Sequence, residues 1–123
     1  MSKKLCLVVD DSRMVRKFAR KILEDLDFEI EEAEDGSLAL EACVRRMPDA
    51  ILLDRNMPVM GGMEFLRELR KTEGGNDPVV VVCTTENDTV KIVEALEAGA
   101  SEYIMKPFND EIIVSKFTQA GLL

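Results

Sequence analysis

The sequence predicts an α/β domain of the doubly wound kind, with a parallel sheet covered by helices on both faces. Short apolar runs of strand length alternate five times with segments whose apolar residues recur at helical spacing. The connections between them are short, as expected when each helix returns the chain to a neighbouring strand. A chain of 123 residues suits one domain with its own core, so we expect residues 1–123 to form a single domain.

Five strands are expected at the short apolar or alternating runs. They are residues 5–9, 28–33, 50–53, 79–83 and 101–105. Apolar and acidic residues alternate in 28–33, which indicates a strand with one wet face near an edge of the sheet. The run 79–83 consists of four valines and a cysteine, which is typical of a strand buried on both faces.

A helix is expected after each strand, where apolar residues recur every three or four positions. The expected first residues or N-caps are Asp11 or Ser12, Ser37, Met63, Asn87 or Asp88, and Asn109. Pro48 ends the second helix, Gly99 closes the fourth and Gly121 the last. The segments 56–62 and 72–77 contain Pro, Gly or both and are predicted to be loops.

The strand order follows from the handedness of parallel crossovers, which leaves few topologies. We expect the flavodoxin-like order 2-1-3-4-5, in which strands 1 and 3 are neighbours at the topological switch point. Ligands of open α/β sheets bind at this point, outside the carboxyl ends of the strands. Asp10, Asp11 and Asp54, which follow strands 1 and 3, would then converge there.

The charge and composition exclude several classes of protein. The chain has 24 acidic and 16 basic residues, a formal charge of −8, which argues against sequence-independent binding of nucleic acid. No apolar run reaches membrane-spanning length, and the basic N-terminus precedes only five apolar residues, too few for a signal peptide. We therefore expect a cytoplasmic protein without a membrane or nucleic-acid partner.

The cysteines and the lack of histidine narrow the chemistry. The chain contains no histidine, which excludes histidine-based catalysis and the commonest zinc and copper ligands. Cys6, Cys43 and Cys83 are an odd number without metal-type spacing. We expect them to be buried, reduced thiols.

Carboxylates end the first and third strands. Asp10 and Asp11 are adjacent, and a hard cation such as Mg²⁺ would relieve their mutual repulsion. In the alternative interpretation Asp11 only caps a helix and Asp10 is solvated. Asp54 is either a turn residue or, beside the acidic pair, a nucleophile that forms an aspartyl phosphate. The backbone carbonyl of Asn56 is a further candidate metal ligand.

A hydroxyl and an ammonium end the fourth and fifth strands. Thr84 can donate to a phosphoryl oxygen, and Lys106 can neutralise phosphoryl charge and pair with Asp54 beforehand. Their alternatives are a β-branched strand residue and an ordinary surface lysine. The Lys106–Pro107 bond is a candidate cis peptide. The order Asp-Asp, Asp, Thr and Lys-Pro at successive strand ends is more specific than any one of these residues.

These segments carry a resemblance. The chain resembles the receiver domain of two-component response regulators over its whole length. The segments concerned are Val8-Val9-Asp10-Asp11-Ser12, Leu53-Asp54-Arg55-Asn56-Met57-Pro58-Val59-Met60-Gly61-Gly62, Thr84, Ala98-Gly99-Ala100 and Lys106-Pro107-Phe108. The resemblance implies a phosphorylation switch without an output domain.

The resemblance also assigns roles to single residues. It implies that Asp54 is phosphorylated and that Thr84 and Lys106 bind the phosphoryl group. Mg²⁺, or Mn²⁺ in its place, would be bound directly by Asp11, Asp54 and the Asn56 carbonyl, and through water by Asp10. Tyr103 matches the family's switch aromatic, which turns inward as the Thr84 hydroxyl moves toward the phosphate; its alternative is a packed strand aromatic.

Several residues around the predicted phosphorylation site bear on how water and the kinase reach it. Asn56, Glu86 and Tyr103 match the chemotaxis regulators of the CheY type, and the first two tune access of hydrolytic water in the family. Arg55 stands where the family often has an apolar residue, and we expect it to pair with Glu86 or to contact the kinase. Thr85 replaces a smaller residue and should narrow the access. The CheY-like positions imply fast loss of the phosphoryl group, and the departures at Arg55 and Thr85 pull against such a rate.

The resemblance implies a partner on each side of the switch. A CheA-like histidine kinase would donate the phosphoryl group, and a monomeric chain would present helix 4, strand 5 and helix 5 to a protein such as the flagellar motor switch. A phosphorelay in stress or cell-cycle signalling is the alternative. Two further alternatives are an Asp-nucleophile phosphatase and a receiver-like module that is never phosphorylated. We expect no enzymatic activity beyond the domain's own phosphotransfer and autodephosphorylation.

Overall fold

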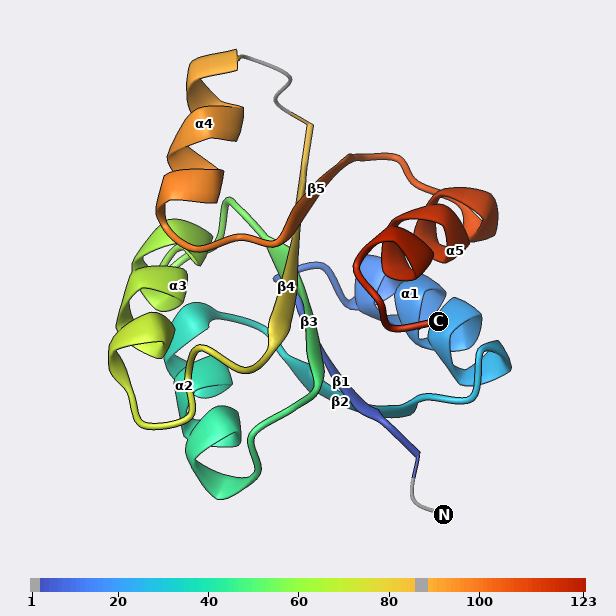
Figure 1. Ribbon diagram of the computed structural model, residues 1–123, viewed down its shortest axis with the longest axis horizontal. Helices are drawn as coiled ribbons and strands as arrows, with labels where there is room; N and C mark the ends of the chain where they lie inside the picture. Colours follow the sequence, from blue (N-terminus) through green and yellow to red (C-terminus); the bar gives the residue numbers. More distant parts are fainter. Residues whose placement is uncertain (1–2, 86–88) are drawn as a thin grey trace.

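The computed structural model describes residues 3–85 and 89–123, which form one parallel sheet flanked by helices (Figure 1). The strands are β1 (Leu5–Val9), β2 (Glu29–Ala33), β3 (Ala50–Asp54), β4 (Val79–Thr84) and β5 (Glu102–Met105). Their order is β2-β1-β3-β4-β5 and all neighbours are parallel. The predicted fold class and strand order are confirmed, with β2 at one edge as its alternating pattern indicated.

The helices are α1 (Arg13–Asp25), α2 (Gly36–Arg45), α3 (Gly62–Lys71), α4 (Thr89–Glu97) and α5 (Asp110–Gln119). Ser12 caps α1 by accepting a hydrogen bond from the backbone N–H of Val15, so it is Ser12 and not Asp11 that caps the helix. Asn109 caps α5 in the same way, as predicted. The expected start of α4 at Asn87 or Asp88 lies outside the described residues.

Helix α2 differs slightly from the prediction. It begins at Gly36, one residue before Ser37, because the Asp35 side chain accepts a hydrogen bond from the Leu38 N–H and so caps the helix one position earlier. It ends at Arg45, before Pro48. The residue preceding a proline is driven out of helical geometry, which explains why the helix stops short of it.

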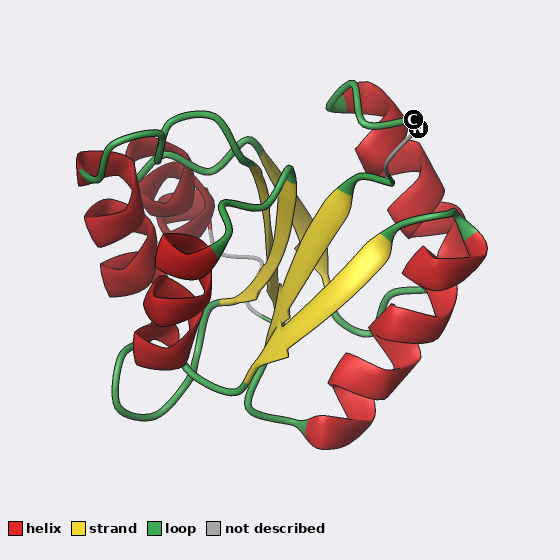
Figure 2. Cartoon of the chain, turned by 90° about the horizontal axis from the view of Figure 1, so that it is seen from below, coloured by secondary structure: helices red, strands yellow, loops and turns green. Residues whose placement is uncertain are grey.

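The core has two layers, one on each face of the sheet (Figure 2). Helices α1 and α5 cover one face, and α2, α3 and α4 cover the other, as Figure 1 also shows. Successive strand residues alternate between the layers, so Leu52 of β3 belongs to the first and Leu53 to the second. In α4 only Ala95 is fully buried, and this helix is therefore lightly packed.

The three cysteines are free and buried, as predicted. Burial raises the pKa of Cys6 to about 12 and that of Cys43 to about 11, which keeps both as unreactive thiols. Among the helices of the described segments, none combines the length and the apolar character needed to cross a bilayer.

Candidate functional site

Two of the candidate acids are brought together by the pairing of β1 with β3. Val9 of β1 is the register partner of Leu53 in β3, so Asp10 and Asp54 follow at the same edge of the sheet. One carboxylate oxygen of each of Asp10, Asp11 and Asp54 lies within 4.8 Å of the others. Asp10 and Asp54 are 3% and 6% exposed, whereas Asp11 is exposed. The predicted convergence at the switch point is present.

Asp10 is held in place by contacts on three sides. Its Oδ1 accepts a hydrogen bond of 2.9 Å from the Ser12 N–H, at the start of α1. Its own N–H donates to the Ala33 carbonyl of β2 at 3.1 Å, and the Arg16 guanidinium donates to its carbonyl at 2.7 Å. The carboxylate is therefore part of the fold and is not a solvated side chain, which sets aside that alternative for Asp10.

Lys106 brings a cation to these acids from the far end of the chain. Its Nζ lies 2.6 Å from Asp10 Oδ2 and 3.1 Å from Asp54 Oδ1. The backbone N–H of Lys106 donates to the Thr84 carbonyl at 2.8 Å. The Lys106–Pro107 bond is cis. Burial lowers the pKa of Lys106, but the hydrogen bond to Asp10 and the charge of Asp54 outweigh it, so the pKa is raised and the ammonium stays charged.

The surroundings of Asp54 disfavour the ionised form of its carboxyl group. Burial raises its pKa above the ordinary value, and the Asp10 carboxylate raises it further. Lys106 and a hydrogen bond from the Asn56 backbone lower it, but not enough to cancel the first two effects. A cation beside Asp54 would offset the repulsion between the Asp10 and Asp54 carboxylates and keep Asp54 ionised.

Thr84 and its neighbours lie at the carboxyl ends of the strands, the same end of the sheet as Asp54. Thr84 is the last residue of β4 and is 1% exposed, and the preceding Cys83 is the register partner of Asp54. Thr85 is exposed, while Glu86 lies outside the described residues, so its expected influence on access stays a prediction. Tyr103 of β5 is half-buried against the second layer, and its switch role likewise stays a prediction.

Arg55 has partners that the sequence did not indicate. Its guanidinium donates to the Lys91 carbonyl at 3.1 Å and forms an ion pair with Glu94, both in α4. Its side chain is only 5% exposed, so it offers little surface to a kinase. The expected pairing with Glu86 lies outside the described residues. Arg55 directly follows β3, and continued alternation of side chains places it on the face opposite to Asp54. This alternation could have suggested a partner among α2, α3 and α4.

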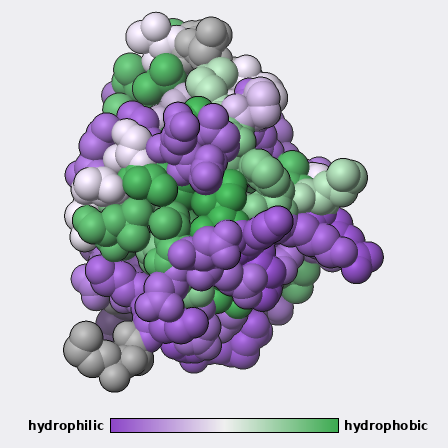
Figure 3. All heavy atoms as spheres, turned by 90° about the vertical axis from the view of Figure 1, so that its right-hand side faces the viewer, coloured by the Kyte–Doolittle hydropathy of each residue, from purple (hydrophilic) through white to green (hydrophobic). Residues whose placement is uncertain are grey.

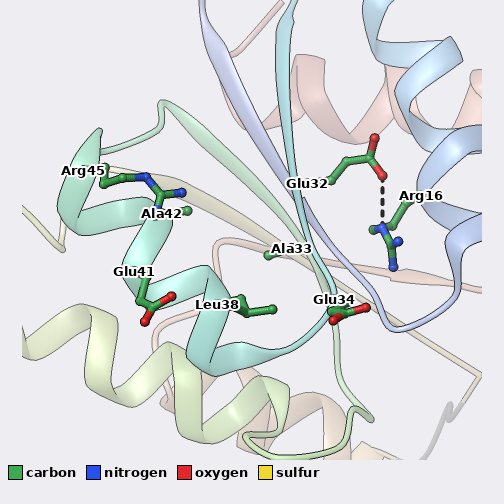
Figure 4. Close-up of a pocket in the computed structure, with 8 residues that line it drawn as sticks. All are labelled: Arg16, Glu32, Ala33, Glu34, Leu38, Glu41, Ala42 and Arg45. Atoms are coloured by element: carbon green, nitrogen blue, oxygen red, sulfur yellow. Dashed lines mark hydrogen bonds and ion pairs between the residues drawn. The ribbon is translucent and has the colours of Figure 1, made fainter.

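Figure 4 shows a hollow beside β2 and the eight residues that line it. It has a volume of about 290 Å³ between α1, β2 and α2, and Arg16 and Glu32 form a 3.0 Å ion pair across one side of it. Glu32 also pairs with Arg20 at 2.8 Å. Arg20 also donates to the Ile30 carbonyl of β2 at 3.4 Å, and charged side chains of this kind are a usual protection of an edge strand. Asp10, Asp11 and Asp54 do not line this hollow.

The donor set at the sheet edge suits one kind of chemistry. Three carboxylates offer the hard oxygen ligands that Mg²⁺ prefers. Burial and the charge of Asp10 raise the pKa of Asp54, and both effects favour a cation there. Asp10, Asp11 and Asp54 would hold the ion. An ammonium and a buried hydroxyl-bearing residue beside them suit the oxygens of a phosphoryl group. The fold and the site thus define a doubly wound domain with an acidic cluster at the topological switch point of its sheet.

Comparison with known proteins identifies the class. The family model of the response regulator receiver domain matches residues 6–118. The chain belongs to the response regulator receiver family.

Individual relatives agree with this. Response regulator MprA of Mycobacterium leprae (strain TN) is 40% identical over 110 residues, which cover 89% of this chain and 47% of the relative. MprA of Mycobacterium ulcerans (strain Agy99) is also 40% identical, with the same coverage. The chain therefore spans about half the length of these relatives.

Solved structures match over nearly the whole chain. The chemotaxis response regulator CheY4 of Vibrio cholerae superimposes with a TM-score of 0.91 and 33% identity, covering 97% of this chain and 99% of CheY4. A CheY-like receiver domain protein of Methanospirillum hungatei JF-1 has a TM-score of 0.87 and 30% identity, covering 96% of this chain and 93% of its own.

Proposed function

We propose that this chain is a phosphorylation switch in which Asp54 accepts a phosphoryl group from the phosphohistidine of a histidine kinase. The observation that carries the proposal is the placement of the Asp54 carboxylate, 3.1 Å from the Lys106 ammonium and within 4.8 Å of two further acids. Membership of the receiver family supports the same donor, since these domains work with a cognate kinase.

The transfer exchanges one bond to phosphorus for another. An Asp54 carboxylate oxygen forms a bond to phosphorus while the bond from phosphorus to the imidazole nitrogen breaks, and the kinase histidine leaves with the electron pair and takes up a proton. Lys106 offsets the charge of the transferred group, and the Thr84 hydroxyl donates to one of its oxygens. When bound, Mg²⁺ supplies further neutralisation of phosphoryl charge.

This chain presents an apolar surface beside Asp54, and this surface is the proposed docking site of the kinase. A hollow of about 360 Å³ is lined by Met14, Val15, Phe18, Lys106, Pro107 and Phe108. Met14 is 82% exposed and Phe18 50%, and the two line the same hollow, so they form part of one apolar patch of the kind that marks interaction sites. Figure 3 shows the face formed by α1 and α5, where hydrophobic surface is bordered by hydrophilic residues. Because Lys106 belongs to both hollow and site, a donor seated here is next to Asp54.

The output surface consists of α4, β5 and α5. The new charge on Asp54 draws Thr84 and Lys106 inward and biases this surface between two states. Val90, Val93 and Leu96 of α4 are 70%, 45% and 47% exposed, which leaves apolar area for a partner protein. The similarity to CheY4, named a chemotaxis response regulator, supports flagellar motor control as the output. A phosphorelay in stress or cell-cycle signalling is the second candidate.

The genomic neighbourhood separates these two outputs, because adjacent genes for a chemotaxis kinase and receptors favour motor control. A phosphatase with an Asp nucleophile would usually have a second Asp two positions later as general acid, and here that position is Asn56. We propose that the domain catalyses only its own phosphotransfer and autodephosphorylation. Repeated turnover of a phosphate monoester would contradict this.

Labelling with a small phosphodonor tests the assignment of Asp54. The chain is incubated with acetyl phosphate and Mg²⁺, and the mass increase of one phosphoryl group is followed for wild type, Asp54→Asn and Asp27→Asn. Asp27 is a matched control because its side chain is 82% exposed and far from the site in the fold. We expect modification of wild type and Asp27→Asn only. Retention of the label in Asp54→Asn would refute the proposal.

A further inference from the structure

We propose that Arg55 is a positioning residue that holds helix α4 in its resting position and thereby weakens the affinity of the acceptor site for a phosphoryl group. The inference rests on the proposed function, since it concerns the regulation of Asp54. It depends on three features: the fixed origin of the Arg55 side chain, its two partners on α4, and the sparse packing of α4 elsewhere.

The Arg55 side chain starts from the residue directly after β3, where two backbone hydrogen bonds hold the chain. Its N–H donates to the Cys83 carbonyl at 3.1 Å, and its carbonyl accepts from the Gly62 N–H at 3.0 Å. Leu53, two residues earlier, lies in the layer covered by α2, α3 and α4. Since strand side chains alternate, Arg55 extends toward that same layer while Asp54 faces the other way. One segment of backbone therefore carries both the phosphoacceptor and a cation directed at α4.

The guanidinium holds α4 by two groups one turn apart. It donates to the Lys91 carbonyl at 3.1 Å and pairs with the Glu94 carboxylate. The Arg55 side chain is 5% exposed and that of Glu94 is 41% exposed, so the guanidinium is shielded from water while the carboxylate is partly solvated. The charge-assisted hydrogen bond is therefore the main compensation for the buried cation. Moving Glu94 away would leave the buried Arg55 guanidinium poorly compensated, so the pair favours the helix position in which it forms.

Helix α4 is lightly packed. Among the described residues of the helix, Ala95 is the only fully buried one, while Val90, Val93 and Leu96 are 70%, 45% and 47% exposed. Its C-terminal end is fixed by Arg70 of α3, whose Nη2 and Nε donate to the Gly99 carbonyl at 2.7 and 3.1 Å. Gly99 has a φ of +112°, which a residue with a Cβ rarely adopts. The helix is thus anchored at one end by Arg70 and along its length by Arg55.

Thermodynamic linkage gives the consequence. If α4 moves when the site is phosphorylated, the Arg55–Glu94 pair stabilises the resting state and not the switched state. A phosphoryl group binds the switched state better, so part of its binding free energy is spent on breaking the pair. Loss of the pair should therefore populate the switched state in advance and tighten the binding of a phosphoryl mimic.

The test measures the affinity for beryllofluoride, the probe named in the structure of the activated DrrB receiver domain, which has a TM-score of 0.86 with this chain. Beryllofluoride with Mg²⁺ is titrated by NMR into wild type, Arg55→Met, Glu94→Ala, the double variant, and Glu97→Ala as the matched control on an exposed position of α4. Hydrogen exchange of the 89–97 amides is measured without beryllofluoride or metal.

We expect both single variants to bind beryllofluoride roughly 5-fold more tightly or better, the lower end of common allosteric couplings. The double variant should gain no more than Arg55→Met, because that substitution already removes both the Glu94 ion pair and the Lys91 hydrogen bond. The α4 amides should exchange faster in the variants, and Glu97→Ala should match wild type. A merely structural role for Arg55 would lower stability without tightening the binding of any ligand.

Unchanged or weaker binding in Glu94→Ala would overturn the inference, and this variant decides alone if Arg55→Met fails to fold. Tighter binding in Glu97→Ala as well would also overturn it, because the effect would then not be specific to the pair. Failure of wild type to bind beryllofluoride would instead count against the proposed function itself.

Discussion

The Lys106 ammonium lies closer to the Asp10 carboxylate, at 2.6 Å, than to the proposed phosphoacceptor Asp54, at 3.1 Å. These contacts join β1, β3 and the chain after β5 through a single side chain. In the resting domain Lys106 therefore offsets part of the charge of two buried acids that repel each other. The same ammonium is in place to meet a phosphoryl group on Asp54 without a large movement.

Substitution Lys106→Met should reveal this double contact. It removes a cation shared by two buried carboxylates while keeping most of the side-chain length. We expect the free energy of unfolding at neutral pH to fall by about 1–3 kcal/mol, the usual cost of losing hydrogen bonds to charged groups. Urea denaturation measures the change. Lys71→Met is the control, because the Lys71 side chain is 73% exposed, and an equal loss there would contradict the explanation.

Substitution Asp54→Asn should make the unphosphorylated domain more stable. Burial and the Asp10 carboxylate oppose ionisation of Asp54, and a neutral amide avoids that cost while Lys106 keeps its shorter contact with Asp10. We expect a gain on the order of 1 kcal/mol in the free energy of unfolding at neutral pH. Urea denaturation without metal measures it. A variant less stable than wild type would show that the Lys106–Asp54 contact outweighs the repulsion.

The gain should depend on pH with a definite sign. Because the pKa of Asp54 is raised in the folded chain, its titration favours folding below the ordinary pKa of an aspartate, and this contribution is lost as pH rises through the raised value. The Asn side chain does not titrate. The difference between variant and wild type should therefore be largest near neutral pH and shrink as pH falls toward about 4. A constant difference would argue against a raised pKa.

Magnesium should stabilise the domain through the three acids. A ligand that binds only the folded state adds about 1.4 kcal/mol at a concentration about ten times its Kd. We expect the Tm to rise with added Mg²⁺, and with Mn²⁺, in wild type and in Asp27→Asn. The rise should be lost in Asp11→Asn, a substitution at an exposed position that should itself cost little stability. An equal rise in Asp11→Asn would exclude Asp11 as a ligand.

Sequence alone was sufficient for the sheet and for the position of the acids. The strands could be predicted because buried parallel strands are nearly uninterrupted apolar runs, and the run 79–83 is the clearest example. Once the strand order was chosen, the convergence of Asp10 and Asp54 followed from the geometry of parallel strands alone. The cap at Ser12 was one of two predicted alternatives, and its hydrogen bond to Val15 decides between them.

The contacts of long charged side chains could not be predicted in the same way. Arg55 and Glu94 are 39 positions apart, and nothing in the sequence distinguishes Glu94 from the other acids of the chain. The preference of Lys106 for Asp10 depends on tenths of an ångström at the ends of flexible side chains. Backbone periodicity determines which face a residue occupies, but the choice of an ionic partner depends on how the folded helices pack.

The apolar surface on α1 should matter for the kinase and not for the chemistry at Asp54. Met14 and Phe18 flank the hollow that contains Lys106, and exposed large apolar residues at an interface often carry much of its binding energy. We expect Met14→Ala and Phe18→Ala each to lower kcat/KM for transfer from a phosphorylated histidine kinase by about 10-fold, which corresponds to about 1.4 kcal/mol. Acetyl phosphate does not dock on this surface, so the rate of phosphorylation by acetyl phosphate should stay within about 2-fold of wild type.

Val44→Ala is the control, since Val44 is 81% exposed on α2, which covers the opposite face of the sheet. Equal losses with both donors would place the defect at the acceptor site, and no loss with the kinase would mean that the donor approaches Asp54 over another surface.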